Sequence, residues 1–117
     1  MNTNELITSI FQNFTVDGKT IPVSFLRYNG KETTYVTWMQ ESMDASLTCD
    51  DELNGYVGMY DFDVYSKGNY SSVIEQIKLK LSENGFVWQP SRSSSDMFED
   101  DTGYYHKTLN FAIFEEV

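Results

Sequence analysis

Residues 56–86, YVGMYDFDVYSKGNYSSVIEQIKLKLSENGF, are the stretch that decides the fold. In the first part, apolar and polar side chains alternate with the period of two that is typical of a half-buried strand. One side holds Tyr56, Tyr60, Phe62 and Val64, and the other holds Met59, Asp61 and Asp63. From Tyr70 onward the spacing becomes that of one helical stripe, formed by Tyr70, Val73, Ile74, Ile77 and Leu81. We therefore expect a strand followed directly by an amphipathic helix that shares its core.

Local signals mark both ends of this helix. The segment Ser66-Lys67-Gly68-Asn69 breaks the strand before it. Ser72 and Glu75 have the spacing of a capping box. Asn84 and Gly85 tolerate the left-handed backbone that ends many helices. We therefore expect a helix that is capped at Ser72 and ended by Asn84-Gly85.

The size and charge of the chain limit its function. With 117 residues it has the ordinary size of one domain, and we expect a single domain over residues 1–117. A hydrophobic fraction of 40% with 8 Phe, 8 Tyr and 2 Trp argues against disorder. The net charge of −10, from 8 Lys and Arg against 18 Asp and Glu, argues against binding of DNA or anionic lipid through basic side chains.

Other features of the sequence predict a soluble protein that is not exported. Cys49 is the one cysteine, so we expect no intrachain disulfide. The N-terminus lacks a basic region followed by an apolar run, and no stretch approaches the roughly 18 apolar residues of a membrane span.

The N-terminal part predicts a helix and a β-hairpin. The first helix covers about residues 3–14, with Asn2 or Asn4 as its cap, and its apolar face holds Leu6, Ile7, Ile10, Phe11 and Phe14. Asp17-Gly18 marks the turn out of it. Ile21, Val23 and Phe25 alternate as a strand, and a second strand covers residues 32–40. Asn29-Gly30 between them suits a type I′ turn, so we expect these two strands to be antiparallel neighbours.

The remaining segments predict two long loops and a last strand. Periodicity stops over residues 41–54, which we expect to be a loop. Residues 86–88 form a short extended piece, and residues 88–103 form a second loop, which Pro90 and a serine tract open. Residues 104–114 alternate as a strand. The expected fold is α+β, in the order α-β-β-β-α-β, with an antiparallel or mixed sheet of about four strands and both helices packed on one face.

The sequence shows no complete catalytic or metal-binding pattern. We therefore expect no enzymatic activity, no metal site and no cofactor. His106 is the only histidine, and Cys49 is its one possible nucleophilic partner; an acidic loop would raise the thiol pKa. These two residues are too few ligands for structural zinc. Asp61-Phe62-Asp63 begins like a calcium loop, but Tyr65 stands where the third ligand belongs. No glycine-rich phosphate loop is present.

The two expected loops carry the candidate functional residues. Their acidic members are Asp44, Asp50, Asp51, Glu52, Glu99, Asp100 and Asp101. These carboxylates are either ordinary surface acids or ligands of a weakly bound divalent ion. Their large apolar members are Met43, Leu47, Trp88, Met97 and Phe98. These side chains either fold over the core or contact a partner subunit.

Several segments carry a resemblance that covers nearly the whole chain. They are the N-terminal helix, IPV at residues 21–23, YNGKETTYV at residues 28–36, VYSKGNY at residues 64–70 before a helix, and EDDTGYYHK at residues 99–107. With these motifs the chain resembles small structural proteins of tailed bacteriophages and prophages. Within that group it is similar to the tail-terminator, or tail-completion, family of long-tailed phages. Residues 41–54 share no motif with the family.

The resemblance implies a non-enzymatic subunit of the virion tail, assembled in the host cytoplasm. It implies a ring, expected to be a hexamer, that caps the tail tube and offers the surface for joining the head; a monomer before assembly is compatible with this role. The partners would be other copies of the chain, the tail-tube protein and the head–tail connector protein. DNA would only pass through the channel, without specific binding, and an acidic chain suits such passage. We expect no contact with a membrane.

Three rival functions remain open. Another head–tail connector or minor tail protein of the same gene cluster would have a similar sequence. A small acidic inhibitor, such as an immunity protein or a DNA mimic, would also combine negative charge with aromatic loops, and its binding would weaken steeply with salt. An acid-based hydrolase would need two carboxylates that converge in a pocket, and no spacing here requires that.

Overall fold

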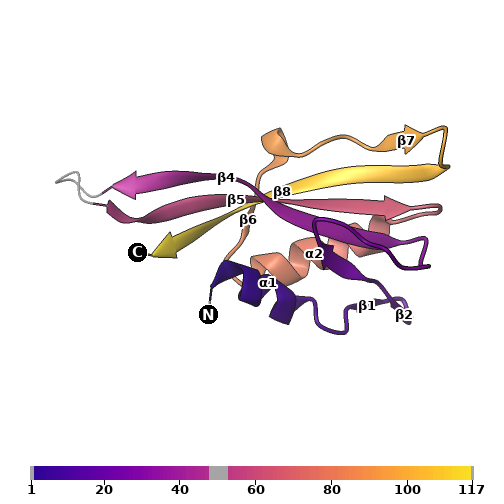
Figure 1. Cartoon of the computed structure of the whole chain (residues 1–117), viewed down its shortest axis with the longest axis horizontal. Helices are drawn as coiled ribbons and strands as arrows, with labels where there is room; N and C mark the ends of the chain where they lie inside the picture. The colour runs from indigo at the N-terminus through magenta and orange to yellow at the C-terminus, as the bar shows by residue number, and fades with distance from the viewer. Residues whose placement is uncertain (1, 48–52, 117) are drawn as a thin grey trace.

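The computed structural model describes residues 2–47 and 53–116, in which two helices pack against a mixed sheet (Figure 1). The elements are α1 (Thr3–Ile10), β1 (Thr15–Val16), β2 (Lys19–Thr20), β3 (Val23–Phe25), β4 (Tyr35–Leu47), β5 (Leu53–Ser66), α2 (Ser71–Ser82), β6 (Val87–Trp88), the 3-10 turn η1 (Pro90–Arg92), β7 (Met97–Glu99) and β8 (Tyr104–Glu116). β1 and β2 form a small separate sheet, and the other strands form a six-stranded sheet.

The expected α+β class with two helices is confirmed, but the expected strand number and order are wrong. The main sheet has the order β3-β4-β5-β8-β6, with β7 also paired to β8. Only β4, β5 and β8 are long; the other strands have two or three residues each. The strands that the sequence did not predict, β1, β2 and β7, are too short to show a period-two pattern, which needs at least four residues to be recognised.

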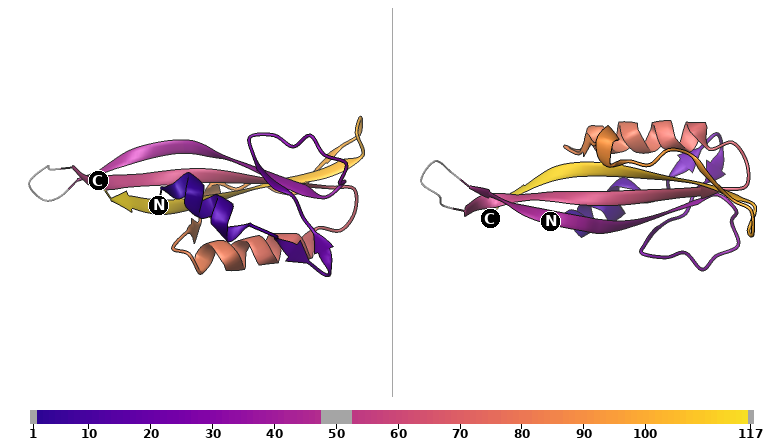
Figure 2. Two further views of the ribbon diagram at one scale, coloured as in Figure 1. Left: turned by 60° about the horizontal axis from the view of Figure 1, so that its bottom comes forward. Right: turned by 90° about the horizontal axis from the view of Figure 1, so that it is seen from above.

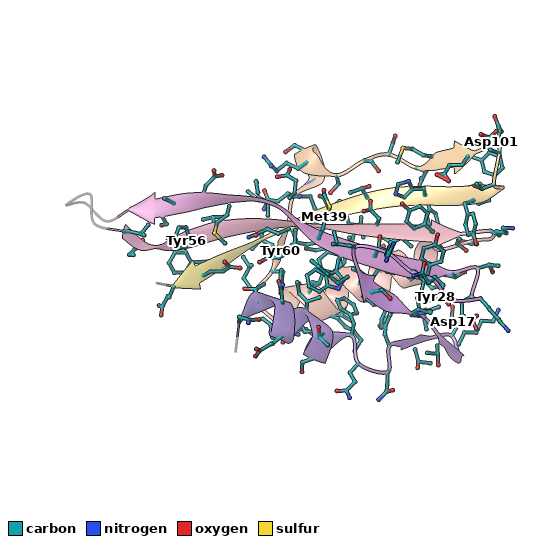
Figure 3. The ribbon with its side chains drawn as sticks, viewed as in Figure 1. Asp17, Tyr28, Met39, Tyr56, Tyr60 and Asp101 are labelled. Carbon is teal, nitrogen blue, oxygen red and sulfur yellow. The ribbon has the colours of Figure 1, made fainter. Side chains whose placement is uncertain are left out.

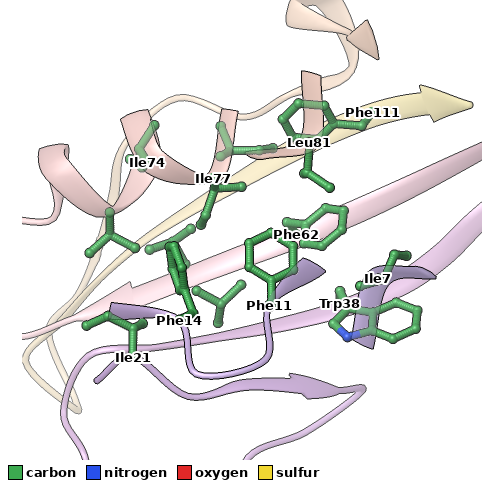
Figure 4. Close-up of a cluster of buried hydrophobic side chains, with 14 of the residues drawn as sticks. Ile7, Phe11, Phe14, Ile21, Trp38, Phe62, Ile74, Ile77, Leu81 and Phe111 are labelled. Atoms are coloured by element: carbon green, nitrogen blue, oxygen red, sulfur yellow. The ribbon is translucent and has the colours of Figure 1, made fainter. Parts of the chain in front are cut away.

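The core lies between one sheet face and both helices (Figure 2). The alternation predicted for the central strand is confirmed, because Tyr60, Phe62 and Val64 of β5 are buried. Figure 4 shows how helix residues such as Ile7 of α1 and Ile77 of α2 meet this face. Fully burying an aliphatic or aromatic side chain contributes about 1.5–3 kcal/mol, so neither helix is stable without the sheet.

The ends of the helices only partly follow the sequence signals. Asn2 caps α1, since its Oδ1 accepts a 2.8 Å hydrogen bond from the Glu5 amide. The predicted capping box at Ser72 is wrong: α2 starts at Ser71, after Tyr70, without a side-chain cap. Instead, Asn69 Oδ1 accepts a 2.9 Å hydrogen bond from the Ser71 amide. The left-handed residue after α2 is confirmed at Gly85, with φ of +87°.

The predicted hairpin at Asn29-Gly30 is wrong. β3 runs parallel to β4, with Val23 opposite Val36, so residues 26–34 form a loop that returns to the start of the sheet. Tyr28 folds back over this loop: its hydroxyl accepts a hydrogen bond from the Glu32 amide, and a Cβ on residue 30 would overlap its ring. The glycine at position 30 therefore accommodates the Tyr28 ring rather than a hairpin turn.

The chain does form a tight two-residue hairpin earlier, at Asp17-Gly18. Both residues have positive φ, 52° and 80°, and they join β1 to β2 in antiparallel register. This is the backbone that a type I′ turn requires. The Asp-Gly pair, which the sequence marked as the turn out of the first helix, thus makes the hairpin expected from Asn-Gly.

The predicted loop over residues 41–54 is also wrong over most of its length. β4 continues to Leu47 and pairs with the start of β5, while residues 48–52 lie outside the described residues. We call residues 41–47 and 53–57 the arm, because this part of the hairpin extends beyond both helices (Figure 1). Neither face of the arm is packed against a helix, so its residues lack the alternation that burial of one face imposes.

The second predicted loop, residues 88–103, is wrong in part. It contains η1 and the short strand β7, which pairs with β8 through Phe98 opposite Tyr105. The extended piece before it is confirmed as β6, and the last strand is confirmed as β8. Neither described helix is long and apolar enough to cross a membrane.

Candidate interaction surface

One face of the main sheet is left without a helix in the described part of the chain (Figure 2). We call it the open face. From β4 it takes Tyr35, Thr37 and Met39; from β5 Met59, Asp61, Asp63 and Tyr65; and from β8 Tyr104, His106, Thr108 and Asn110. Strand alternation sends these side chains away from the core, because their neighbours in sequence point toward the helices.

A row of stacked rings crosses the open face near the loop of residues 26–34. Tyr35, Tyr65 and His106 lie opposite one another on β4, β5 and β8. The ring centroids of Tyr28 and Tyr35 are 4.7 Å apart, those of Tyr35 and Tyr65 5.0 Å, and those of Tyr65 and His106 4.2 Å. Pairs of this kind contribute about 0.5–1.5 kcal/mol beyond burial, so the row holds the three long strands in register.

Two tyrosines of the ring row, Tyr35 and Tyr65, have raised hydroxyl pKa values. Burial raises the pKa of Tyr65 to about 12, and the nearby Asp63 carboxylate adds to the shift. The pKa of Tyr35 is raised as well, first by burial and then by Tyr104 and Glu99. Lys67 lies over the Tyr104 ring, with Nζ 5.1 Å from its centroid. The hydroxyls of Tyr35 and Tyr65 are therefore protonated at neutral pH.

Two carboxylates occupy the middle of the open face, and both are held by β8. Asp61 accepts a 2.7 Å hydrogen bond from Asn110 Nδ2. Asp63 Oδ1 accepts a 2.5 Å hydrogen bond from Thr108 Oγ1 and lies 3.1 Å from His106 Nε2. Burial raises the pKa of Asp61, the hydrogen bond from Asn110 opposes this, and the charges of Asp63 and Glu41 add to it. These acids are fixed in place rather than freely solvated.

Arg92 joins the far edge of the sheet to the base of the arm. It belongs to η1 beside β8, yet its Nη2 lies 2.6 and 2.8 Å from the two carboxylate oxygens of Glu41 on β4. Its side chain must therefore pass over β8 and β5. Glu41 is the extra residue of a β-bulge between Gln40 and Ser42, and this bulge turns it toward Arg92. The pKa of Glu41 is lowered, first by the Ser42 hydrogen bond and then by Arg92.

Two side chains of the serine tract, Ser93 and Ser94, form hydrogen bonds with backbone amides along the edge of β8. The Asn110 amide donates to Ser93 Oγ at 2.9 Å, and the Thr108 amide donates to Ser94 Oγ at 2.8 Å. Ser93 Oγ also accepts from Trp88 Nε1 at 3.0 Å. Between β6 and β7 these hydroxyls thus take the place of a neighbouring strand, whereas the serine tract by itself indicated only a loop.

The apolar candidates from the sequence do not come together. Met43 lies on the arm, Trp88 on β6, and Met97 and Phe98 on β7, and all four are exposed. The Leu47 side chain is outside the described residues. Trp88 packs within the chain, since Lys78 Nζ lies 3.8 Å from its ring centroid. The remaining exposed candidates occupy two separate regions, the arm and the β7 strand.

The acidic candidates are also divided between the two ends of the molecule. Asp44 lies on the arm, whereas Glu99 ends β7 and Asp100 and Asp101 form the turn to β8 (Figure 3). Asp50, Asp51, Glu52 and Cys49 lie outside the described residues. Among the residues that are described, no group of three or more His, Cys, Asp or Glu side chains is placed to hold a metal ion.

Neither the ring row nor the Arg92–Glu41 pair was predicted from the sequence. A signal for the ring row exists: Tyr35 and Tyr65 are large aromatics on the side of their strands opposite the buried residues. The Arg92–Glu41 pair has no such signal, because it depends on a bulge and on strand order. No protein-family model matches this chain, and no curated protein matches it either.

Proposed function

We propose that this chain is a structural subunit of a phage tail, which assembles with copies of itself into a ring that ends the tail tube. The ring, expected to be hexameric, would contact the tail-tube protein on one side and the head–tail connector on the other. The family resemblance of the sequence suggests the tail role. The structural observation that supports assembly is the arm.

The arm is a part of the sheet without a core of its own. The molecule measures 52 × 27 × 23 Å, and its long axis follows β4 and β5 into the arm. Beyond Trp38, β4 has no neighbour on its outer edge among the described residues, because β3 pairs only as far as that residue. Exposed strand edges and apolar residues such as Met43 are features of surfaces that another chain completes.

The charge of this region fits a channel through which DNA passes. The sequence contains no Lys or Arg between Lys31 and Lys67, whereas it contains acids throughout that stretch. Asp61 and Asp63 add fixed carboxylates to the open face. A wall of this charge does not neutralise phosphates and so does not retain DNA.

Light scattering of the purified protein, alone and mixed with tail tubes that lack their terminator, tests this function. A ring-sized mass alone, or a ring on the tube end in electron micrographs, is the expected result. Met43→Asp on the arm should reduce assembly, whereas Leu79→Asp, which puts the same charge on the exposed face of α2, should not. A protein that stays monomeric and ignores tube ends would contradict the proposal.

An acidic inhibitor is the second candidate, and the stretch between Lys31 and Lys67, which holds acids but no Lys or Arg, is the observation that favours it. A DNA mimic would bind one basic protein with an affinity that falls steeply as salt rises. Titration with a basic protein at two salt concentrations separates the functions, because an inhibitor forms a complex of defined stoichiometry that does not need tail tubes. A connector or minor tail protein of the same gene cluster is a variant of the first proposal, because neither the sequence nor the fold distinguishes it from a tail terminator.

A further inference from the structure

The two sides of the sheet at the end away from the arm have complementary surfaces. β3 is the first strand of the sheet, and β7 lies beyond β8 on the opposite side. We call residues 23–31 the β3 edge and residues 97–101 the β7 edge. Figure 3 places Tyr28 of the β3 edge and Asp101 of the β7 edge at the same end of the molecule but on opposite sides.

We propose that the β3 edge of one copy binds the β7 edge of the next copy, head to tail, and that this contact closes the ring. The inference rests on the proposed function, since it names a second surface, besides the arm, through which the copies join. It commits to a second copy of this chain as the occupant of both edges.

Each edge carries a pair of exposed apolar side chains. Phe25 and Leu26 on the β3 edge are 52% and 58% exposed, and Met97 and Phe98 on the β7 edge are 40% and 52% exposed. Inside the chain, the Phe25 ring packs against Trp38 and the Phe98 ring against Tyr105, each with a centroid distance of 4.9 Å, and both rings remain about half exposed. Joining the edges would remove both apolar pairs from water at once.

The charges of the two edges are opposite. The β3 edge carries Arg27 and Lys31, with Glu32 next to it as the one nearby acid in the loop. The β7 edge carries Glu99, Asp100 and Asp101 and no basic residue. Within the described residues, none of these five edge side chains forms a salt bridge. These opposite charges favour contact between a β3 edge and a β7 edge. They disfavour contact between two β3 edges or between two β7 edges.

The strand directions allow the edges to pair as a sheet. β3 is parallel to β4, which is antiparallel to β5, and β8 and then β7 each reverse direction again. β7 therefore runs antiparallel to β3, and a copy placed alongside offers antiparallel pairing. Both strands are paired on one side only among the described elements. A contact between two different surfaces, repeated about an axis, closes into a ring when the rotation fits.

Charge reversal tests the contact. The first variant is Arg27→Glu with Lys31→Glu, and the second is Asp100→Lys with Asp101→Lys. Each alone should raise the protein concentration needed for half-assembly at low salt by at least about tenfold, because like charges then face each other. The two variants mixed in equal amounts should regain assembly, since each reversed edge meets its complement. The quadruple variant should regain it for the same reason.

A matched control changes the charge elsewhere. Glu75→Lys with Glu83→Lys alters the net charge as much as the second variant does, but on the exposed face of α2 and at the residue that follows it. This control should assemble like the unchanged protein. Circular dichroism of each variant verifies that the fold persists, as expected for exposed residues.

The outcomes separate this inference from the proposed function. Restored assembly in the mixture supports both. Rings that form equally well in all variants overturn the edge contact and leave the ring itself standing. If the unchanged protein forms no ring at high concentration or on tail tubes, both proposals are overturned.

Discussion

The Asn110 side chain is fully buried on the open face, and its Nδ2 donates a 2.7 Å hydrogen bond to Asp61 Oδ1 on the neighbouring strand. Its own Oδ1 has no hydrogen-bond partner among the described residues. A buried carbonyl oxygen without a donor is unfavourable, and the partly buried Asp61 carboxylate beside it is unfavourable as well. This pair therefore limits the stability of the sheet.

Asp61→Asn should increase the free energy of unfolding at neutral pH by about 0.5–1.5 kcal/mol, because it removes the carboxylate charge and places an NH2 donor beside Asn110 Oδ1, which has no partner in the described part of the chain. Burial raises the pKa of Asp61 in the folded protein above its unfolded value, so the ionised carboxylate destabilises the fold above that folded pKa. The penalty disappears as the pH falls through the folded pKa. Urea unfolding at several pH values should thus show a gain that shrinks in acid, while Asp44→Asn on the exposed arm changes little.

Ser93→Ala should lower the free energy of unfolding by about 1–3 kcal/mol, because the amide of Asn110 and the indole of Trp88 lose their common acceptor. Hydrogen exchange should accelerate at the Asn110 amide more than at amides paired between β5 and β8. Ser91→Ala is the control, since the Ser91 side chain makes no hydrogen bond to a described residue. Equal exchange at Asn110 in both variants would show that Ser93 does not hold this edge.

Arg92 and Glu41 should couple weakly. Both side chains are partly exposed, and exposed ion pairs contribute about 0–1 kcal/mol. A double-mutant cycle with Arg92→Ala and Glu41→Gln measures the coupling free energy, which should fall as salt is added. Because the pKa of Glu41 is lowered in the folded protein, its contribution is present at neutral pH and is lost as the pH falls through the folded value. Coupling well above this range would mean that the pair is shielded from solvent.

Phe62→Ala should lower the free energy of unfolding by about 3–5 kcal/mol. Phe62 is fully buried, and its ring lies 5.8 Å from that of Phe11 on the α1 side and 5.8 Å from that of Phe111 on β8. Phe114→Ala removes the same side chain from an exposed position on β8 and should cost much less. Thermal unfolding of the two variants compares them directly, and similar losses would contradict the core described here.

The predictable parts of the fold are those in which local pattern and burial agree. β5 alternates because Phe62 and its neighbours face the helices while Asp61 and Asp63 do not. The arm was missed because both of its faces are free of helices, so no alternation is imposed. The Asn29-Gly30 hairpin was wrongly predicted because Gly30 accommodates the Tyr28 ring, a contact that depends on where the chain folds back.

The sequence by itself determined the α+β class, the two amphipathic helices, the central and last strands, and the acidic charge. These follow from the spacing and type of side chains, which act over a few residues. Only the tertiary structure decided that β3 is parallel to β4, that His106 stacks on Tyr65, that Arg92 reaches Glu41, and that the β3 and β7 edges lie on opposite sides. These relationships depend on strand order and register, which arise when distant segments bury one common core.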